Sequence, residues 1–132
     1  MKIAAITDDG STISQHFGRA PHYLVVTVED GQIVDRQLRD KLGHTHFANE
    51  PHEKGLPGQP HGFDPAAQNR HARMAEAIAD CRALLCGGMG AGAYESMRVR
   101  GIQPVVTDIA LIDEAVLAYV EGRIVDRTDR LH

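Results

Sequence analysis

The sequence predicts an α/β domain built on a mixed five-stranded sheet. The dipeptide Asp30-Gly31 separates two β-rich runs, which is a strong short-range signal for an antiparallel hairpin. In the second half of the chain, strand-like and helix-like segments alternate, a pattern typical of parallel strands with helices packed on the sheet. The length of 132 residues suits a single domain.

The first half supplies three strands and a long loop. Residues 2–7 read as a buried strand, and residues 22–29 and 32–39 form the two arms of the hairpin. Residues 41–63 carry four glycines, three prolines and no periodicity. A loop of this length within a compact domain is usually functional or disordered.

The second half supplies the helices. Asp64-Pro65 provides an N-cap and a first-turn proline for a helix that extends to about Asp80. Its apolar face comprises Ala67, His71, Met74, Ala75 and Ile78. The later elements are a strand at 83–87, a short helix ending near Gly101, an edge strand at 102–107 marked by Pro104, and a helix at about 112–121. We therefore expect one domain over residues 1–122 and a loose polar tail over residues 123–132.

The composition argues against several classes of partner. The net charge is −4 and no lysine or arginine cluster forms a basic stripe, so we expect no nucleic acid partner. No apolar stretch approaches the length of a transmembrane helix, so we expect no membrane partner. The N-terminus does not resemble a signal peptide, which predicts a cytoplasmic location. Cys81 and Cys86 are too few for a disulfide framework and are expected to be free thiols.

A glycine-rich turn follows the strand at 83–87. Four of the six residues from Gly87 to Gly92 are glycines, and a helix is expected directly after them. Backbone N–H groups at a helix N-terminus carry about half a positive charge, so the turn suits a bound anion. A tight strand-to-helix turn is one alternative. The other is a nucleotide-binding enzyme, because Gly88–Ala93 matches G-x-G-x-x-G/A and Asp108 lies 20 residues after Gly88.

Candidate metal ligands gather in and after the long loop. They are His44, His46, His52, His61 and Cys86. Imidazole and thiolate together accept soft or borderline metals, so a divalent ion such as zinc, nickel or copper is one hypothesis. No spacing matches a structural zinc pattern, and a solvated loop is the alternative for the histidines.

Other residues have competing interpretations. Cys86 is alternatively a small apolar residue of a buried strand, and Met89 is either an exposed sulfur or a core residue. His71, on an apolar helix face, is more typical of a hydrogen-bonded core residue than of a ligand. Asp8 and Asp9 fit an acidic turn better than a carboxylate metal site, because no further carboxylates clearly converge on them.

Two segments resemble the signatures of one family. Ser14-Gln15-His16-Phe17-Gly18-Arg19-Ala20-Pro21 and Gly87-Gly88-Met89-Gly90-Ala91-Gly92-Ala93-Tyr94-Glu95 resemble the dinitrogenase iron–molybdenum cofactor biosynthesis family, the NifX-like proteins. Ala91 stands where the family often has proline, and His22 where an aromatic residue is common. The resemblance implies a ribonuclease-H-like three-layer α/β/α motif. It also implies a non-catalytic accessory or carrier protein for an iron–molybdenum–sulfur or related metal–sulfur cluster.

The residues of the two segments lead us to expect where such an anionic cluster would lie. It would sit against two loops, whose residues are His16, Phe17, Gly18, Arg19, Gly87, Gly88, Met89, Gly90 and Gly92. Arg19 would donate charge-assisted hydrogen bonds to cluster sulfides, and the loop histidines or Cys86 would add one or two metal bonds. The partners would be cluster-assembly or acceptor proteins. An exposed hairpin and the edge strand with Pro104 are compatible with a homodimer.

Overall fold

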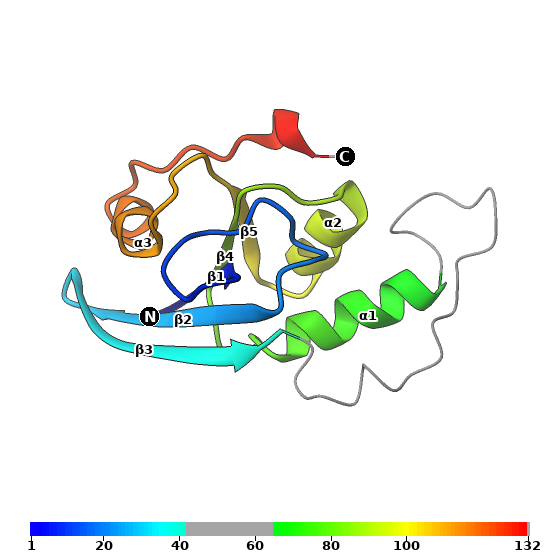
Figure 1. Ribbon diagram of the computed structural model, residues 1–132, viewed down its shortest axis with the longest axis horizontal. Helices are drawn as coiled ribbons and strands as arrows, with labels where there is room; N and C mark the ends of the chain where they lie inside the picture. Colours follow the sequence, from blue (N-terminus) through cyan, green and yellow to red (C-terminus); the bar gives the residue numbers. More distant parts are fainter. Residues whose placement is uncertain (42–64, 132) are drawn as a thin grey trace.

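The computed structural model describes residues 1–41 and 65–131 and contains one five-stranded sheet with three α-helices (Figure 1). The strands lie in the order β3-β2-β1-β4-β5. The elements are β1 (Lys2–Thr7), β2 (His22–Glu29), β3 (Gln32–Asp40), α1 (Pro65–Glu76), β4 (Ala83–Cys86), α2 (Ala91–Val99), β5 (Gln103–Val106), α3 (Ile112–Val120) and the short 3₁₀ helix η2 (Thr128–Arg130). The predicted ligands His44, His46, His52 and His61 lie outside the described residues.

The sheet is mixed, as the sequence predicts. β1 pairs antiparallel with β2, and β2 pairs antiparallel with β3. β4 runs parallel to both β1 and β5. The hairpin turn places Asp30 at φ 53° and Gly31 at φ 77°, the two left-handed conformations of a type I′ turn. The α/β class and the mixed five-stranded sheet are therefore confirmed.

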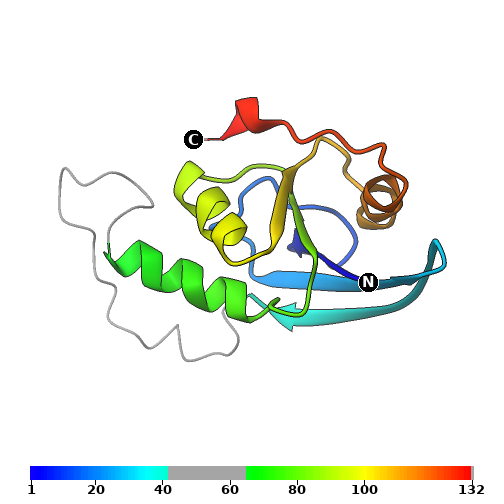
Figure 2. The ribbon, with the colours of Figure 1, turned by 180° about the vertical axis from the view of Figure 1, so that it is seen from behind.

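Helices cover both faces of the sheet. Arg36 and Arg39 of β3 are three residues apart and so point to opposite faces. Arg36 makes two bonds to the Asp113 carboxylate of α3, at 3.1 and 2.6 Å, whereas Arg39 bonds to the end of α1. α2 packs against α1 and β5, on the α1 side of the molecule (Figure 2). The result is three layers with the central strands β1 and β4 buried between them.

The core follows from this layering. Ile3, Ala5 and Ile6 of β1 and all four residues of β4 have no exposed surface, as expected for strands covered on both faces. In α1 and the turn that follows it, the predicted apolar positions His71, Met74, Ala75 and Ile78 are buried. None of the helices in the described part of the chain combines the length and apolarity needed to cross a membrane.

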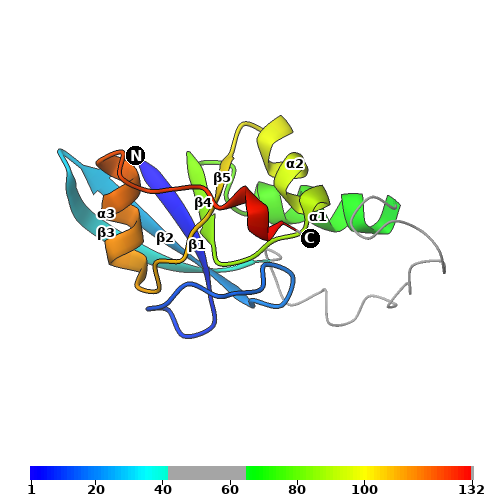
Figure 3. The ribbon, with the colours of Figure 1, turned by 90° about the horizontal axis from the view of Figure 1, so that it is seen from above.

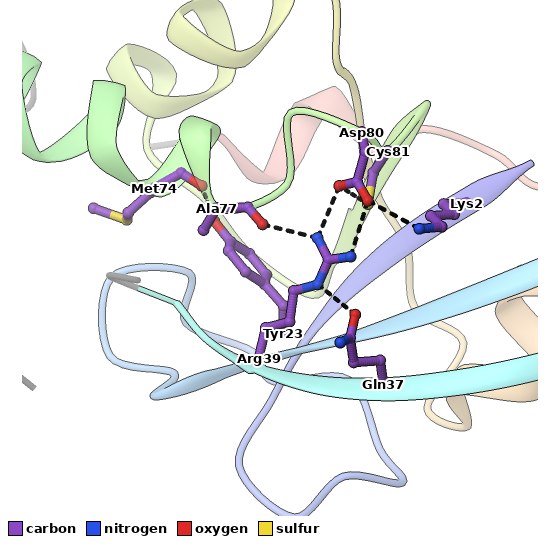
Figure 4. Close-up of polar contacts among 8 residues, drawn as sticks. All are labelled: Lys2, Tyr23, Gln37, Arg39, Met74, Ala77, Asp80 and Cys81. Atoms are coloured by element: carbon purple, nitrogen blue, oxygen red, sulfur yellow. Dashed lines mark hydrogen bonds and ion pairs between the residues drawn. The ribbon is translucent and has the colours of Figure 1, made fainter. Parts of the chain in front are cut away.

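An ionic network fixes the end of α1 to the sheet (Figure 4). The Arg39 guanidinium donates to the Ala77 carbonyl at 3.0 Å and to both Asp80 oxygens at 2.8 and 2.9 Å. Lys2 donates to the same carboxylate at 3.1 Å. The Tyr23 hydroxyl donates to the Met74 carbonyl at 3.0 Å.

The prediction that this helix extends to about Asp80 is wrong by four residues. The α-helix ends at Glu76, after which the amides of Ile78, Ala79 and Cys81 each bond to the carbonyl three residues earlier. Such tight turns commonly finish a helix. The Ala77 carbonyl points instead to Arg39, so a tertiary contact sets the end of the helix.

The expectation of a loose tail after residue 122 is also wrong. The Val106 amide donates to the Asp126 carboxylate at 2.9 Å, and the Arg127 amide donates to the Val106 carbonyl at 2.7 Å. Tyr94 donates to the same Asp126 at 2.6 Å. β5 is an edge strand, so its outward-facing backbone groups need partners, and the tail supplies them.

We expect Asp80→Asn to reduce the free energy of unfolding by about 1 kcal/mol at neutral pH, since the network is partly exposed and screened by solvent. The hydrogen bonds from Arg39, then those from Lys2, hold the pKa of Asp80 well below its usual range. The wild-type protein should therefore lose this contribution as the pH falls below about 4, and the variant should not.

The matched control is Asp35→Asn on β3, an exposed carboxylate without a hydrogen bond or ion pair to the rest of the described chain. Chemical denaturation from about pH 2 to about pH 7 measures both variants. Equal acid sensitivity of the two variants would show that Asp80 does not contribute in this way.

Candidate functional site

Three loops meet where the parallel strands end. β1, β4 and β5 run in one direction, so residues 8–20, 87–90 and 107–111 all follow the carboxyl ends of these strands, on one side of the molecule (Figure 3). We call these three segments the loop cluster. Ligands of open α/β sheets bind outside the carboxyl ends of the strands, so the loop cluster is the candidate site.

Backbone hydrogen bonds join the loops to one another. The Gly87 amide donates to the Ser14 carbonyl at 2.9 Å, and the Phe17 amide donates to the Gly88 carbonyl at 3.0 Å. The third loop is joined by bonds from the Ile13 amide to the Ala110 carbonyl at 2.8 Å and from the Ile112 amide to the Ser11 carbonyl at 3.0 Å. The two segments that resemble family signatures are therefore in direct contact.

Gly87 and Gly88 are required by this contact. A Cβ atom on Gly87 would lie 2.9 Å from the Ser14 carbonyl oxygen, and one on Gly88 would lie 2.4 Å from the Gln15 carbonyl oxygen. Both distances are too short for any side chain, and both oxygen atoms belong to the backbone. The Gly87 N–H is already bonded to the Ser14 carbonyl and is therefore not open to an anion.

The start of α2 has no side-chain cap. Gly90 is the N-cap residue and provides no side chain to cap the first turn. The amides at the start of a helix have no partner within the helix. Gly90 is half-buried, Ala91 is exposed and Gly92 is buried, so a ligand would approach at Gly90 and Ala91.

The predicted residues of the first loop divide into two groups. His16, Gly18 and Arg19 are exposed, whereas Phe17 is buried between them. The Arg19 and Ala20 amides both donate to the His16 carbonyl, which folds the loop back on itself. The loop therefore presents an imidazole and a guanidinium to solvent beside the glycine turn.

The sulfur atoms are internal. Met89 is 1% exposed, so it is a core residue and the alternative of an exposed sulfur is wrong. Cys86 is fully buried, its thiol donates to the Val105 carbonyl at 3.6 Å, and burial raises its pKa to about 12. Cys81 and Cys86 are free thiols, as predicted. Within the described residues no three histidine, cysteine or carboxylate side chains are grouped to hold a metal ion.

The acidic residues of the cluster have structural partners. Asp9 accepts the Ser11 and Thr12 amides and the Thr12 hydroxyl. The hydrogen bonds from Thr12 and Ser11 hold the pKa of Asp9 well below its usual range, which fits the acidic-turn interpretation. Asp108, the acidic residue of the dinucleotide hypothesis, forms an ion pair with Arg127 at 3.0 Å.

Sequence reasoning missed Lys41. It directly follows β3 and is 3% exposed. Its ammonium donates to the Phe17 carbonyl and lies 4.5 Å from the centroid of the Phe17 ring. Burial lowers its pKa to about 8. A lysine at the start of a glycine- and proline-rich loop is ordinarily solvated, so no sequence pattern distinguishes it.

Comparison with known proteins places these features in one family. The family described as "Dinitrogenase iron-molybdenum cofactor" matches residues 1–122. The FeMo cofactor biosynthesis protein NifB of Frankia alni is 32% identical over 129 residues, which are 97% of this chain and 22% of NifB. The chain thus spans about a fifth of the length of that relative.

Solved structures share the fold at lower identity. The apo form of the orange protein from Desulfovibrio gigas has a TM-score of 0.64 at 18% identity. The match covers 96% of this chain and 92% of the orange protein chain. A putative dinitrogenase (mj0327) from Methanocaldococcus jannaschii has a TM-score of 0.62 at 14% identity. The match covers 97% of this chain and 95% of the dinitrogenase chain.

We expect Gly88→Ala to reduce the free energy of unfolding by about 1–3 kcal/mol, because the new methyl group would push residues 14–17 away from β4. Gly18→Ala, in the same loop cluster, is the control. A Cβ atom there would meet nothing within 4 Å, and we expect a change within about 0.5 kcal/mol. Urea denaturation measures both variants. A Gly88→Ala protein as stable as Gly18→Ala would contradict the close contact.

Proposed function

The chain belongs to the dinitrogenase iron–molybdenum cofactor family, and on this premise we propose that it carries an iron–molybdenum–sulfur or related metal–sulfur cluster as its cargo. It would receive the cluster from an assembly protein or deliver it to an acceptor, without catalysing a reaction. The name of the Frankia relative, a FeMo cofactor biosynthesis protein, supports this class of cargo. The geometry supports a ribonuclease-H-like classification as well, since β1–β3 are antiparallel, β4 and β5 are parallel, and helices cover both faces.

The observation that carries the proposal is the contact between the two signature loops. Metal–sulfur clusters of this type are anionic and have sulfide acceptors on their surface. The loop cluster offers them the exposed Arg19 guanidinium and the start of α2, which no side chain caps. His16 is exposed on the same loop and is available as a metal ligand.

The predicted site residues take two different roles in this proposal. His16, Gly18, Arg19 and Gly90 have surface that a cluster can touch. Phe17, Gly87, Gly88 and Met89 are buried and hold those four in place. Cys86 stays a protonated thiol inside the sheet and is not proposed as a ligand.

Anaerobic reconstitution with ferrous iron, molybdate and sulfide tests the proposal. After desalting, we expect the protein to retain metal together with acid-labile sulfide and to show charge-transfer absorption in the visible range. Protein that emerges colourless and free of sulfide would overturn the carrier function.

We further expect Arg19→Ala to weaken retention of the reconstituted cluster by about tenfold, because one charge-assisted hydrogen bond contributes roughly 1.5 kcal/mol. Arg98→Ala is the control. It removes an exposed arginine from the last turn of α2, the end of the helix that points away from the loop cluster. Metal analysis after dialysis against a chelator measures retention. Equal losses from the two variants would place the cluster elsewhere.

A further inference from the structure

Lys41 is an unusual residue in this fold. Among the side chains that the structure describes, it is the only lysine, arginine or carboxylate that is buried. Its backbone is tied to the first loop, because the Lys41 amide donates to the Pro21 carbonyl at 3.1 Å. Charged groups are rarely buried without a partner, since removing a charge from water is costly.

The ammonium is only partly satisfied. It has three N–H donors, and within residues 1–41 and 65–131 a single acceptor, the Phe17 carbonyl, receives one of them. The face of the Phe17 ring adds a weak cation–π contact. In the same part of the chain no carboxylate lies within ion-pair distance. Among the described residues Lys41 is thus a buried cation without an ion pair, and Asp8 is the carboxylate whose charge acts on it from a greater distance.

Phe17 places this charge directly behind the loop cluster. Its carbonyl accepts from Lys41, while its amide donates to the Gly88 carbonyl at 3.0 Å. The residues on either side of Phe17, His16 and Gly18, are exposed, as is Arg19. One peptide segment therefore separates the buried ammonium from the surface that carries the candidate site.

We propose that Lys41 is the buried counter-charge of an anion-binding surface formed by residues 16–19 and the start of α2. The ammonium holds Phe17 inward and attracts the anion from behind the loop without touching it. The proposal rests on the carrier function for its ligand class, which is a metal–sulfur anion. It adds to that function one residue, Lys41, and a link between anion binding and the protonation of Lys41.

Anion binding is linked to the protonation of Lys41 because the side chain is buried. Burial lowers its pKa to about 8, and an anion held in front of Phe17 favours the charged form and raises that pKa again. Binding is then strongest below about pH 8, where the ammonium is already protonated, and weakens as the pH rises above that value. Cys86 adds no charge there, because burial raises its pKa to about 12. Among the described residues, the groups whose charge acts on the ammonium are Asp8 and Cys86, while His16, Arg19, His22 and Asp40 lie on the segments that adjoin Lys41.

An anaerobic titration with tetrathiomolybdate, a dianion of molybdenum and sulfide, tests the proposal. Affinity is measured from about pH 7 to about pH 9.5 for the wild-type protein, Lys41→Arg and Lys41→Met. Arg123→Met is the matched control. It removes one exposed positive charge beyond the C-terminal end of α3, whose N-terminal end is the one that adjoins the loop cluster. Thermal melting establishes that each variant is folded.

We expect the wild-type affinity to fall about tenfold across this range, which corresponds to a one-unit rise in the pKa of Lys41 on binding. Lys41→Arg should keep the high affinity and lose the pH dependence, since guanidinium stays charged. Lys41→Met should bind about tenfold more weakly near pH 7, again without pH dependence. Arg123→Met should behave as the wild type.

Two results would overturn the inference, and they are distinguishable. If the wild type binds and Lys41→Met keeps its affinity or its pH dependence, Lys41 is not the counter-charge, and the carrier function stands. If the wild type does not bind tetrathiomolybdate, both the role of Lys41 and the proposed anionic cargo are wrong. A folded Lys41→Met protein is sufficient for the decision even if arginine cannot be accommodated at this position.

Discussion

The backbone contact between residues 14–17 and Gly87-Gly88 is the constraint on which the site depends. β1 and β4 are parallel neighbours, so the loops that follow them leave the sheet side by side. They can approach to hydrogen-bonding distance only because one of them lacks Cβ atoms at the point of contact. The contact turns Phe17 into the core and leaves His16 and Arg19 outside. The glycines are thus needed for the architecture before any ligand is considered.

A second set of long-range contacts positions α1. Residues 42–64 separate β3 from α1 in the sequence, so the two elements are distant along the chain. The position of α1 relative to the sheet is specified by Tyr23, which bonds to the Met74 carbonyl, and by Arg39, which bonds beyond the end of the helix. Each contact spans more than 35 residues of sequence. The sheet and the helix are therefore joined by side chains that donate to carbonyl groups in the helix and just after it.

Local patterns in the sequence were sufficient for the sheet and helices but not for the contacts between them. The Asp30-Gly31 turn and the Pro104 edge strand follow from backbone geometry, which a short window of residues encodes. The end of α1 could not be predicted, because Arg39, distant in sequence, sets it. In the site, the clustering of the two signature loops was predictable, whereas the burial of Lys41 depends on the packing of Phe17 and has no local signal.

The outer edge of β5 has a consequence for how copies of this chain can associate. Residues 104 and 106 face outward there: Pro104 has no N–H, and the N–H and carbonyl of Val106 are both bonded to the tail. That edge offers no donor to a strand from another molecule. Within the described sheet the other edge is β3. The open-ended addition of strands that builds a fibre needs two pairing edges on each copy, so the β5 edge disfavours it.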